Sequence, residues 1–354
     1  MANKISLENE ALFPILPQPT GIARLASHAV HADDGHLIEF KSLEVRSILN
    51  KSTSKRLRWL AWSINPYRGC EFGCKYCYAR YTHEFMELRD PLAFERIIFL
   101  KQNAAWLLEQ ELRKIDPADE IAIGTATDPY QPIERRAQIT RSLLEVFSRR
   151  QGYRLGIVTK SRLIERDIDL LTEIARRNTL VVHITITTPD TELARLLEPR
   201  APRPDLRFRA VKRLREAGLR TGILCCPLLP GITDTQEALN EMARRAAEVG
   251  ASFLAANPLF LKPCSRPTYL SFVREHFPAL VDDYAKRFDH ADFAAPAYRQ
   301  KLAQMVEKAR KLYGLKQRSN ATLVTDNNTN IELVRKPPTR ALQLQQELFA
   351  ACAP

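Results

Sequence analysis

The chain has no apolar run long enough to cross a membrane, and its N-terminal residues are polar. A spanning helix needs roughly 18 or more consecutive apolar residues, and no such run occurs. Residues 1–10 also lack the basic region followed by an apolar stretch that marks a secretory signal peptide. Only seven of the 354 residues are cysteine, and their spacing does not resemble a secreted disulfide framework. We therefore expect a cytoplasmic protein without a membrane span.

Three of these cysteines lie close together, in the spacing Cys70-x3-Cys74-x2-Cys77. Three thiolates on one short loop can hold three irons of a cubane cluster and leave the fourth iron open to a substrate or cofactor. A simple electron carrier needs a fourth thiolate, but the next cysteine along the chain is Cys225. The spacing therefore favours a catalytic cluster. A structural zinc of the Cys3His type, closed by His83, is the alternative.

The residues around this motif carry a family resemblance. The order Cys-x3-Cys-x-aromatic-Cys is similar to the signature of the radical S-adenosylmethionine (radical SAM) superfamily. The run from Ser63 to Cys70, followed by Tyr78-Ala79-Arg80, resembles the branch related to spore photoproduct lyase. The resemblance implies a 4Fe-4S cluster on the three cysteines, whose open iron chelates SAM. It also implies that one electron, from a donor of the flavodoxin or ferredoxin type, cleaves SAM to methionine and a 5′-deoxyadenosyl radical.

Short apolar runs alternate with stretches of helical periodicity through the middle of the chain. The runs predict strands at 63–67, 121–126, 154–159, 180–186, 221–226 and 252–256, and the periodic stretches predict helices at 94–114, 139–149, 163–176, 190–197 with 206–217, and 235–249. Repeated strand–helix units make right-handed parallel crossovers, so this order predicts a curved parallel sheet of six βα units. The resemblance implies the same α/β fold, a partial (βα)6 radical SAM barrel.

The pattern also predicts how the chain is organised. We expect an N-terminal arm over 1–59, the radical SAM core over 60–260, a C-terminal helical extension over 261–316, and a linker and tail over 317–354. Apolar residues at helical spacing in the extension are expected to close the open side of the sheet.

Barrel enzymes place their chemistry at the carboxyl ends of the strands. By resemblance to the superfamily, the SAM contacts are expected in chain order after successive strands: Thr127 and Asp128 at the amino group, Lys160 at the carboxylate, Thr185 and Thr187 at the ribose, and Gly231 at the adenine. Alternatives remain open, because Lys160 fits a surface lysine equally well, and the two threonines on the fourth strand fit β-branched core residues.

One departure from spore photoproduct lyase concerns a further cysteine. That enzyme uses a cysteine near the second strand to return a hydrogen atom to the product radical, and this chain has none between Cys77 and Cys225. Repair of a thymine dimer by that route is therefore not expected. Cys225 or Cys226, at the end of the fifth strand, are the candidate hydrogen donors. The alternative is that they fill the core, as free cysteines commonly do.

The chain carries an excess of basic residues that is locally concentrated. It has 53 basic and 41 acidic residues, a formal charge of +12. An excess of this kind favours an anionic partner such as a nucleic acid. A solvated helix face is the alternative for the densest stretch, whose nine basic residues are Arg195, Arg200, Arg203, Arg207, Arg209, Lys212, Arg213, Arg215 and Arg220.

Three functions are compatible with these patterns. The leading hypothesis is a radical SAM enzyme that abstracts hydrogen from an unidentified substrate, with nucleic acid as a candidate and a lyase or transferase-like outcome. The second is a non-catalytic nucleic-acid-binding protein with a structural metal site. The third is a cluster-bearing maturase that acts on another protein.

Overall fold

The computed structural model describes residues 20–29, 31–34, 38–52, 60–289 and 291–318. The chain divides into two compact units, Met1–Leu323 and Val324–Pro354, and the fold below is that of the first. The second unit, with all of the predicted tail beyond residue 318, lies outside the described residues. No described helix is long and apolar enough to cross a membrane.

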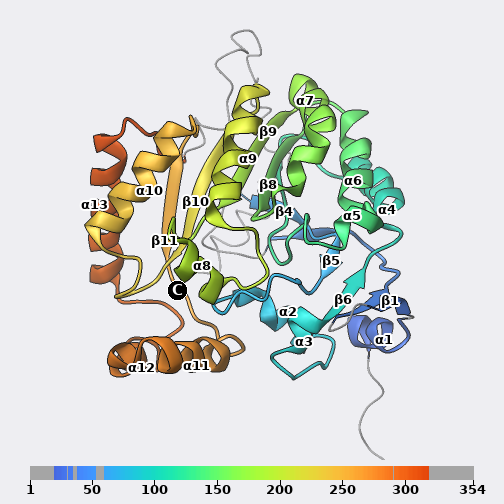
Figure 1. Ribbon diagram of the computed structural model, residues 1–354. Coiled ribbons are helices and arrows are strands. Elements are labelled where there is room, and N and C mark those ends of the chain that lie inside the picture. The colour runs from blue at the N-terminus through green and yellow to red at the C-terminus, as the bar shows by residue number, and fades with distance from the viewer. Residues whose placement is uncertain (1–19, 30, 35–37, 53–59, 290, 319–354) are drawn as a thin grey trace, which may run out of the picture. The chain divides into compact units, whose positions relative to one another are not determined.

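A seven-stranded sheet forms the centre of the fold (Figure 1). Its order is β11-β10-β9-β8-β7-β4-β3; neighbouring strands from β4 to β11 are parallel, and β3 is antiparallel at the edge. The bounds are β3 Leu49–Lys51, β4 Leu60–Ile64, β7 Glu120–Ile123, β8 Arg154–Thr159, β9 Thr179–Thr185, β10 Thr221–Leu228 and β11 Leu254–Pro258. The parallel strands and their crossover helices confirm the predicted α/β barrel fold.

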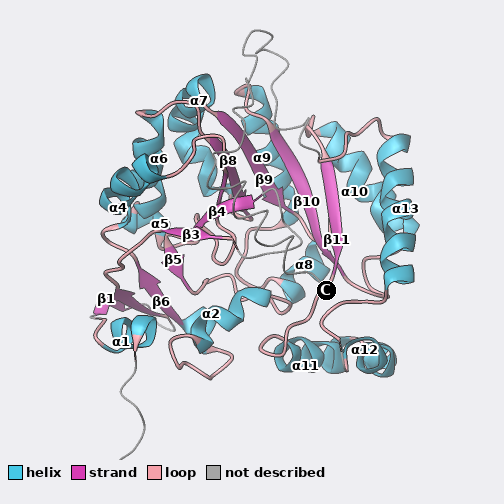
Figure 2. Cartoon of the chain, turned by 180° about the vertical axis from the view of Figure 1, so that it is seen from behind, coloured by secondary structure: helices cyan, strands magenta, loops and turns pink. Residues whose placement is uncertain are grey.

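Amphipathic helices cover the outer face of this sheet (Figures 1 and 2). They are α4 Ala104–Glu111, α6 Ile139–Ser148, α7 Ile168–Arg177, α9 Pro204–Glu216, α10 Gln236–Glu248 and α13 Pro296–Leu312. Leu143 of α6 and Val211 of α9 join Ile157 and Ile184 of the strands in one buried core. Each such side chain contributes roughly 1.5–3 kcal/mol by burial. Helix α13 contacts α10 and β11, so the predicted extension supplies the helix beside the last strand.

The segment 94–114 is not the single helix that its periodicity predicted. It contains the end of α3 (Ala93–Arg96), then β6 (Ile97–Leu100), α4 and η2 (Leu112–Lys114). Strand β6 pairs in parallel with β2 (Glu39–Ser42) and antiparallel with β5 (Tyr67–Arg68). The Ile-Ile-Phe-Leu run of β6 is rich in residues that favour strands. The helix prediction was wrong because the partner strand comes from distant sequence, which local periodicity does not reveal.

A second sheet, in the order β1-β2-β6-β5, leads into the three-cysteine loop. Its first strand β1 (His31–Asp34) follows α1 (Gly21–Ser27) and pairs with β2. The region predicted as an arm therefore contributes strands to both sheets. The first barrel strand is β4, which begins before the predicted span 63–67, and Tyr67 belongs to the second sheet instead.

Short elements occupy the loops that follow the strands. They are η1 (Tyr78–Arg80) and α2 (Tyr81–Glu84) after β5, α5 (Glu134–Ala137) after β7, η3 (Arg162–Asp167) after β8, α8 (Thr191–Leu197) after β9, and α11 (Arg266–His276), η4 (Pro278–Leu280) and α12 (Val281–Phe288) after β11. The hydroxyl of Tyr284 in α12 donates to the Pro230 carbonyl at 2.8 Å, so this extension contacts the loop after β10. The loops that carry the predicted site residues follow the carboxyl ends of the parallel strands.

Candidate active site

Cys70, Cys74 and Cys77 lie on the loop between β5 and η1, here called the cysteine loop (residues 69–77). Cys70 and Cys74 are buried and Cys77 is half-buried. Burial raises the pKa of all three thiols, that of Cys74 to about 12, and negative charge on neighbouring thiols raises the pKa of Cys70 further. These surroundings therefore disfavour free thiolates on the loop. A set of iron ions would supply the positive charge that thiolates at these positions require.

The donor set fits a cluster better than a single zinc ion. A zinc ion needs four ligands converging on one point, and no three His, Cys, Asp or Glu side chains converge in this way in the described part of the chain. The cubane cluster places each thiolate on a different iron, so it does not need such convergence. His83, the proposed fourth zinc ligand, has its Nε2 2.9 Å from the Ile97 carbonyl, and its ring packs against Phe94 and Phe99.

The loop after β7 holds the start of the cysteine loop. The Thr127 hydroxyl donates to the Gly69 carbonyl at 2.5 Å, and the Gln131 amide lies 3.2 Å from the same hydroxyl. The Gln131 carbonyl accepts from the Glu71 amide at 2.8 Å, while the Glu71 carboxylate accepts from the Ile133 amide at 2.7 Å. Thr127 therefore orients the cysteine loop, and its contact with SAM stays a prediction. Sequence reasoning missed Gln131, whose only signal was its place in a polar loop after a strand.

Asp128 ties the end of β7 to the end of β8. Its carboxylate accepts from the Thr159 hydroxyl at 2.6 Å, from the Lys160 amide at 2.7 Å and from the Tyr130 amide at 2.9 Å. Burial raises the pKa of Asp128, and these three donors oppose that rise. The carboxylate thus fixes where the Lys160 backbone leaves its strand. A direct contact of Asp128 with SAM remains a prediction.

A buried ionic group, here called the Glu198 network, lies beside the loop and consists of Tyr76, Thr187, Glu198 and Arg207. Glu198 and Arg207 are only 2% and 1% exposed, and their Oε2 and Nη2 atoms are 2.5 Å apart. The Tyr76 hydroxyl donates to Glu198, and the Thr187 hydroxyl does so at 3.0 Å. Burial raises the pKa of Glu198, but Arg207 and Lys160 hold it below its usual value. The position of Tyr76, the aromatic residue of the cysteine motif, is therefore fixed by its hydrogen bond to Glu198, which follows α8.

Lys160 carries its charge next to the cysteine loop. Its Nζ lies 5.7 Å from the centroid of the Tyr76 ring. Burial lowers the pKa of Lys160, but Cys74 and Glu198 raise it more, so the ammonium stays protonated. A cation in this place can pair with a carboxylate bound at the loop. Lys160 is therefore half-buried beside the cysteine loop, and its contact with the SAM carboxylate stays a prediction.

The remaining candidates on β9 and β10 have different surroundings. Thr185 is buried, and its carbonyl accepts from Arg207 Nη1 at 3.2 Å. Cys225 lies in the core between sheet and helices, with its sulfur 3.5 Å from the Thr187 carbonyl. Cys226, the next residue of β10, points to the opposite face of the sheet, where its sulfur is 3.7 Å from Asn257 Nδ2. Burial raises the pKa of Cys226 to about 11, and hydrogen bonding from Asn257 and the charge of Lys160 moderate it.

Gly231 lies in an exposed turn with a positive φ of 73°. A Cβ atom there would lie 3.1 Å from the Leu280 side chain, and the Gly231 amide donates to Asp234 at 2.7 Å. The turn is therefore packed against the helical extension. Its predicted contact with adenine stays a prediction.

Two further groups at the cysteine loop had no signal in the sequence. The Cys264 sulfur lies 3.8 Å from the Tyr78 carbonyl, and the Ser265 hydroxyl donates to the Cys77 carbonyl at 2.7 Å. Arg200 donates to the Glu71 carbonyl and forms a 2.6 Å ion pair with Glu95. These residues are far from the motif in sequence, so only the fold reveals the contacts.

Most of the dense basic stretch is engaged within the chain. Arg200 and Arg207 belong to the contacts just described, and Arg213 pairs with Glu165 at 2.6 Å. Arg203 pairs with Asp205 at 3.0 Å, and Arg215 donates to the Gly250 carbonyl at 2.8 Å. Several basic residues of this stretch therefore have partners within the chain and stabilise the fold. Nucleic-acid binding by this stretch stays a prediction.

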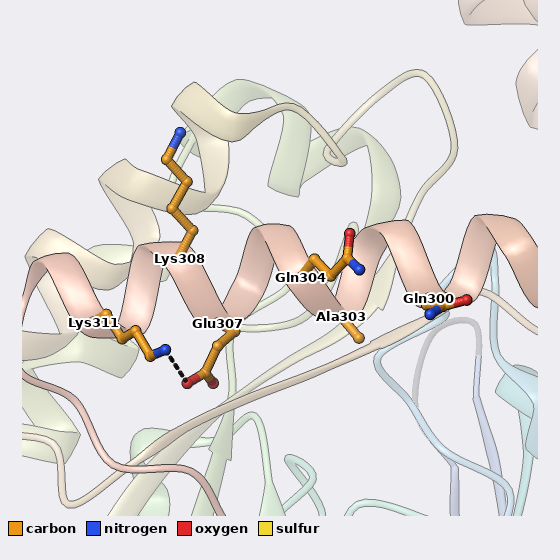
Figure 3. A pocket seen from close by; sticks show the side chains of 6 residues that line it. All are labelled: Gln300, Ala303, Gln304, Glu307, Lys308 and Lys311. Carbon is orange, nitrogen blue, oxygen red and sulfur yellow. Dashed lines mark ion pairs between the residues drawn. The ribbon is translucent and has the colours of Figure 1, made fainter.

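A surface hollow of about 610 Å³ lies along α13 (Figure 3). It is lined by Gln300, Ala303, Gln304, Glu307, Lys308 and Lys311. Glu307 and Lys311 pair with each other at 3.7 Å. None of these residues belongs to the loops that surround the cysteines, so the hollow is not part of the candidate site.

The buried pair of the Glu198 network allows a stability test. Glu198→Gln leaves the Arg207 charge without its partner, and breaking a buried pair in this way costs about 3–5 kcal/mol. We expect that loss of unfolding free energy in urea titrations, and a smaller loss when Arg207→Met is added. Because the folded pKa of Glu198 is lowered from 4.5, its contribution is present above pH 4.5 and lost as pH falls through the folded pKa.

The matched control for this test is Glu216→Gln. Glu216 is exposed and lies 3.9 Å from Lys212, so its loss should change stability by about 0–1 kcal/mol. Equal effects of the Glu198 and Glu216 substitutions would contradict a structural role for the network.

Comparisons with known proteins identify the family of the chain. A family model described as the radical SAM superfamily matches residues 64–246. "Uncharacterized protein Rv2578c" of Mycobacterium tuberculosis is 31% identical over 270 residues, which are 76% of this chain and 79% of that protein. "Uncharacterized protein MJ0683" of Methanocaldococcus jannaschii is 30% identical over 178 residues, 50% of this chain and 64% of that protein.

Solved structures show the same fold. One variant of spore photoproduct lyase superposes with a TM-score of 0.57 at 18% identity, over 77% of this chain and 79% of that chain. Another variant, with bound AdoMet and dinucleoside spore photoproduct, gives a TM-score of 0.54 at 14% identity over the same shares of the two chains. At these identities the likeness concerns the fold alone. With the family match, however, it leads to a plain conclusion: this chain belongs to the radical SAM superfamily of enzymes.

Proposed function

We propose that Cys70, Cys74 and Cys77 hold a 4Fe-4S cluster with one open iron, at which SAM is bound and reductively cleaved. The observation that carries the proposal is the placement of three thiols on one short loop, two buried and one half-buried, with the Lys160 ammonium 5.7 Å from the centroid of the Tyr76 ring of that loop. When bound, such a cluster would supply one electron, which cleaves SAM to methionine and a 5′-deoxyadenosyl radical that takes a hydrogen atom from the substrate.

The residues around the loop would bind and orient SAM. Lys160 is suited to pair with the SAM carboxylate because its ammonium is charged and lies beside Cys74. The Glu198 network would keep Tyr76, and with it the loop between Cys74 and Cys77, in one position. The predicted SAM contacts of Thr127, Asp128, Thr185, Thr187 and Gly231 belong to this proposal as well.

Of the two candidate hydrogen donors, Cys226 is the better placed. Its sulfur points away from the helix-side core and lies near Asn257 and Lys160. Cys225 is enclosed among core side chains. A thiol role in returning hydrogen to a product radical would therefore fall to Cys226.

The net charge of the chain points to the class of substrate. The charge of +12 favours an anionic substrate, and a nucleic acid is the candidate, acted on in a lyase or transferase-like reaction. The electron would come from a flavodoxin or ferredoxin type donor. All six described cysteines are free, which suits a reducing cytoplasm. A non-catalytic nucleic-acid-binding protein with a structural metal is the alternative. In it, His83 would bind the metal through Nδ1, because Nε2 is engaged by the Ile97 carbonyl.

The first test measures 5′-deoxyadenosine by chromatography after anaerobic incubation of the reconstituted protein with SAM and dithionite. We expect product from the unchanged protein and background levels from Cys74→Ala, because a cluster ligand is lost. Lys160→Met should raise the KM for SAM about 10- to 100-fold, since a charge-assisted hydrogen bond contributes roughly 1.5–3 kcal/mol. Cys225→Ala, the matched control, should keep full cleavage. A Cys74→Ala protein that loads a cluster and cleaves SAM normally would refute the proposal.

The second test separates the cluster from the zinc alternative by metal analysis. We expect iron and sulfide in the anaerobically purified protein, and an unchanged iron content in His83→Gln, because three thiolates hold the cluster without a histidine ligand. Bound zinc that is released by His83→Gln would instead establish the Cys3His site.

A further inference from the structure

Two cationic side chains share one face of the second sheet, next to the cysteine loop. Arg68 of β5 lies opposite Phe99 of β6 in the antiparallel register. Lys101 follows two residues after Phe99, and its amide donates to the Pro66 carbonyl at 3.2 Å, which continues the pairing. Because side chains alternate along a strand, Arg68, Phe99 and Lys101 point to the same side, and diagonal neighbours lie within reach of long side chains.

These two cations have no carboxylate partner in the described part of the chain. Lys101 is only 3% exposed, and its ammonium makes no ion pair or hydrogen bond with a described residue. The Nε of Arg68 is buried and likewise without a hydrogen-bond partner. Among the described carboxylates, Glu111 raises the pKa of Lys101, and it already accepts from the amides of Ile48 at 3.1 Å and Leu49 at 2.8 Å.

Burying unpaired charge is costly, so this arrangement requires an explanation. Desolvation of an ammonium costs several kcal/mol unless an anion compensates it. Burial and the charge of Arg68 lower the pKa of Lys101 to about 7, which is the response of a cation that lacks a counter-ion. A bound anion would remove that penalty.

A further basic residue, Lys262, lies near the solvent-exposed end of the region around Arg68 and Lys101. Burial raises the pKa of Tyr81 and the nearby charge of Arg68 opposes that rise; the Tyr81 hydroxyl makes no hydrogen bond to a described residue. Lys262 Nζ lies 4.0 Å from the centroid of the Tyr81 ring and has no carboxylate partner among the described residues. Phe85, edge-on to Tyr81, is 58% exposed, so this end is open to solvent.

We propose that Arg68 and Lys101, with the Tyr81 hydroxyl and with Lys262 at the rim, form a binding site for a phosphate group. A planar guanidinium fork and two ammonium groups match the geometry and charge of a phosphate oxyanion. Arg68 lies two residues before Cys70 and Tyr81 four residues after Cys77, so a phosphate bound here is held next to the cysteine loop. The site does not depend on the SAM chemistry proposed above. The phosphate comes either from a small phosphorylated molecule or from a nucleic-acid backbone.

The test is isothermal titration calorimetry on the full chain at constant ionic strength. The two probes are inorganic phosphate and a dinucleotide with a single phosphodiester. We expect saturable binding of at least one probe, weakened at least tenfold by Lys101→Met and by Lys262→Gln. Lys308→Met, an exposed lysine on α13, is the matched control and should leave binding unchanged. Binding of phosphate alone would identify a small phosphorylated ligand, and binding of the dinucleotide would identify a nucleic-acid backbone.

The unfolding temperatures of the variants show whether a loss of binding results from misfolding. Because Lys101→Met removes an uncompensated buried charge, it should raise the unfolding temperature in phosphate-free buffer and abolish any rise on adding phosphate. Lys262 is half-buried and has no carboxylate partner among the described residues, so Lys262→Gln, which loses only the contact with the Tyr81 ring, should change the unfolding temperature without phosphate only a little. Absence of binding to either probe, or equal affinity in the unchanged protein and both variants, would overturn the site.

Discussion

The buried ion pair between Glu198 and Arg207 is the interaction on which the geometry of the site depends. It joins Glu198, which follows α8, to Arg207 of α9. Through Glu198 it also contacts Tyr76 of the cysteine motif and Thr187 after β9. A buried charge pair holds its position only when its remaining hydrogen bonds are satisfied. Tyr76, Thr187 and the Thr185 carbonyl supply them here. The pair therefore links the fourth strand of the barrel to the loop that presents the thiols.

The cysteine loop has little regular structure of its own and is held from three sides. The β7 loop binds the Gly69 carbonyl through Thr127. The Phe94 carbonyl near α3 accepts from the Cys70 amide at 2.9 Å, and the Leu197 carbonyl of α8 accepts from the Lys75 amide at 2.9 Å. Supports from separate elements explain how a short loop with little regular structure is held in one position. They also explain why the chemistry sits at the carboxyl ends of the strands, where those elements meet.

Sequence patterns predicted the features that depend on local residues. The motif Cys70-x3-Cys74-x2-Cys77 identified the family, and alternating apolar runs identified the strands. Features that depend on distant partners were missed: β6 was predicted as helix because β2 is remote in sequence. The partners of Tyr76 and the contact of Ser265 with Cys77 depend on tertiary folding in the same way. A single sequence shows which residues are polar, but not which of them are in contact in the folded protein.

Electron paramagnetic resonance of the dithionite-reduced protein, recorded with and without SAM, tests the central claim most directly. If three thiols leave one iron of a 4Fe-4S cluster open, SAM binds that iron and changes its electronic environment. The account predicts a signal of a reduced 4Fe-4S cluster whose g-values shift when SAM is added. A cluster signal that is identical with and without SAM, or no cluster signal in protein carrying its full metal content, would contradict it.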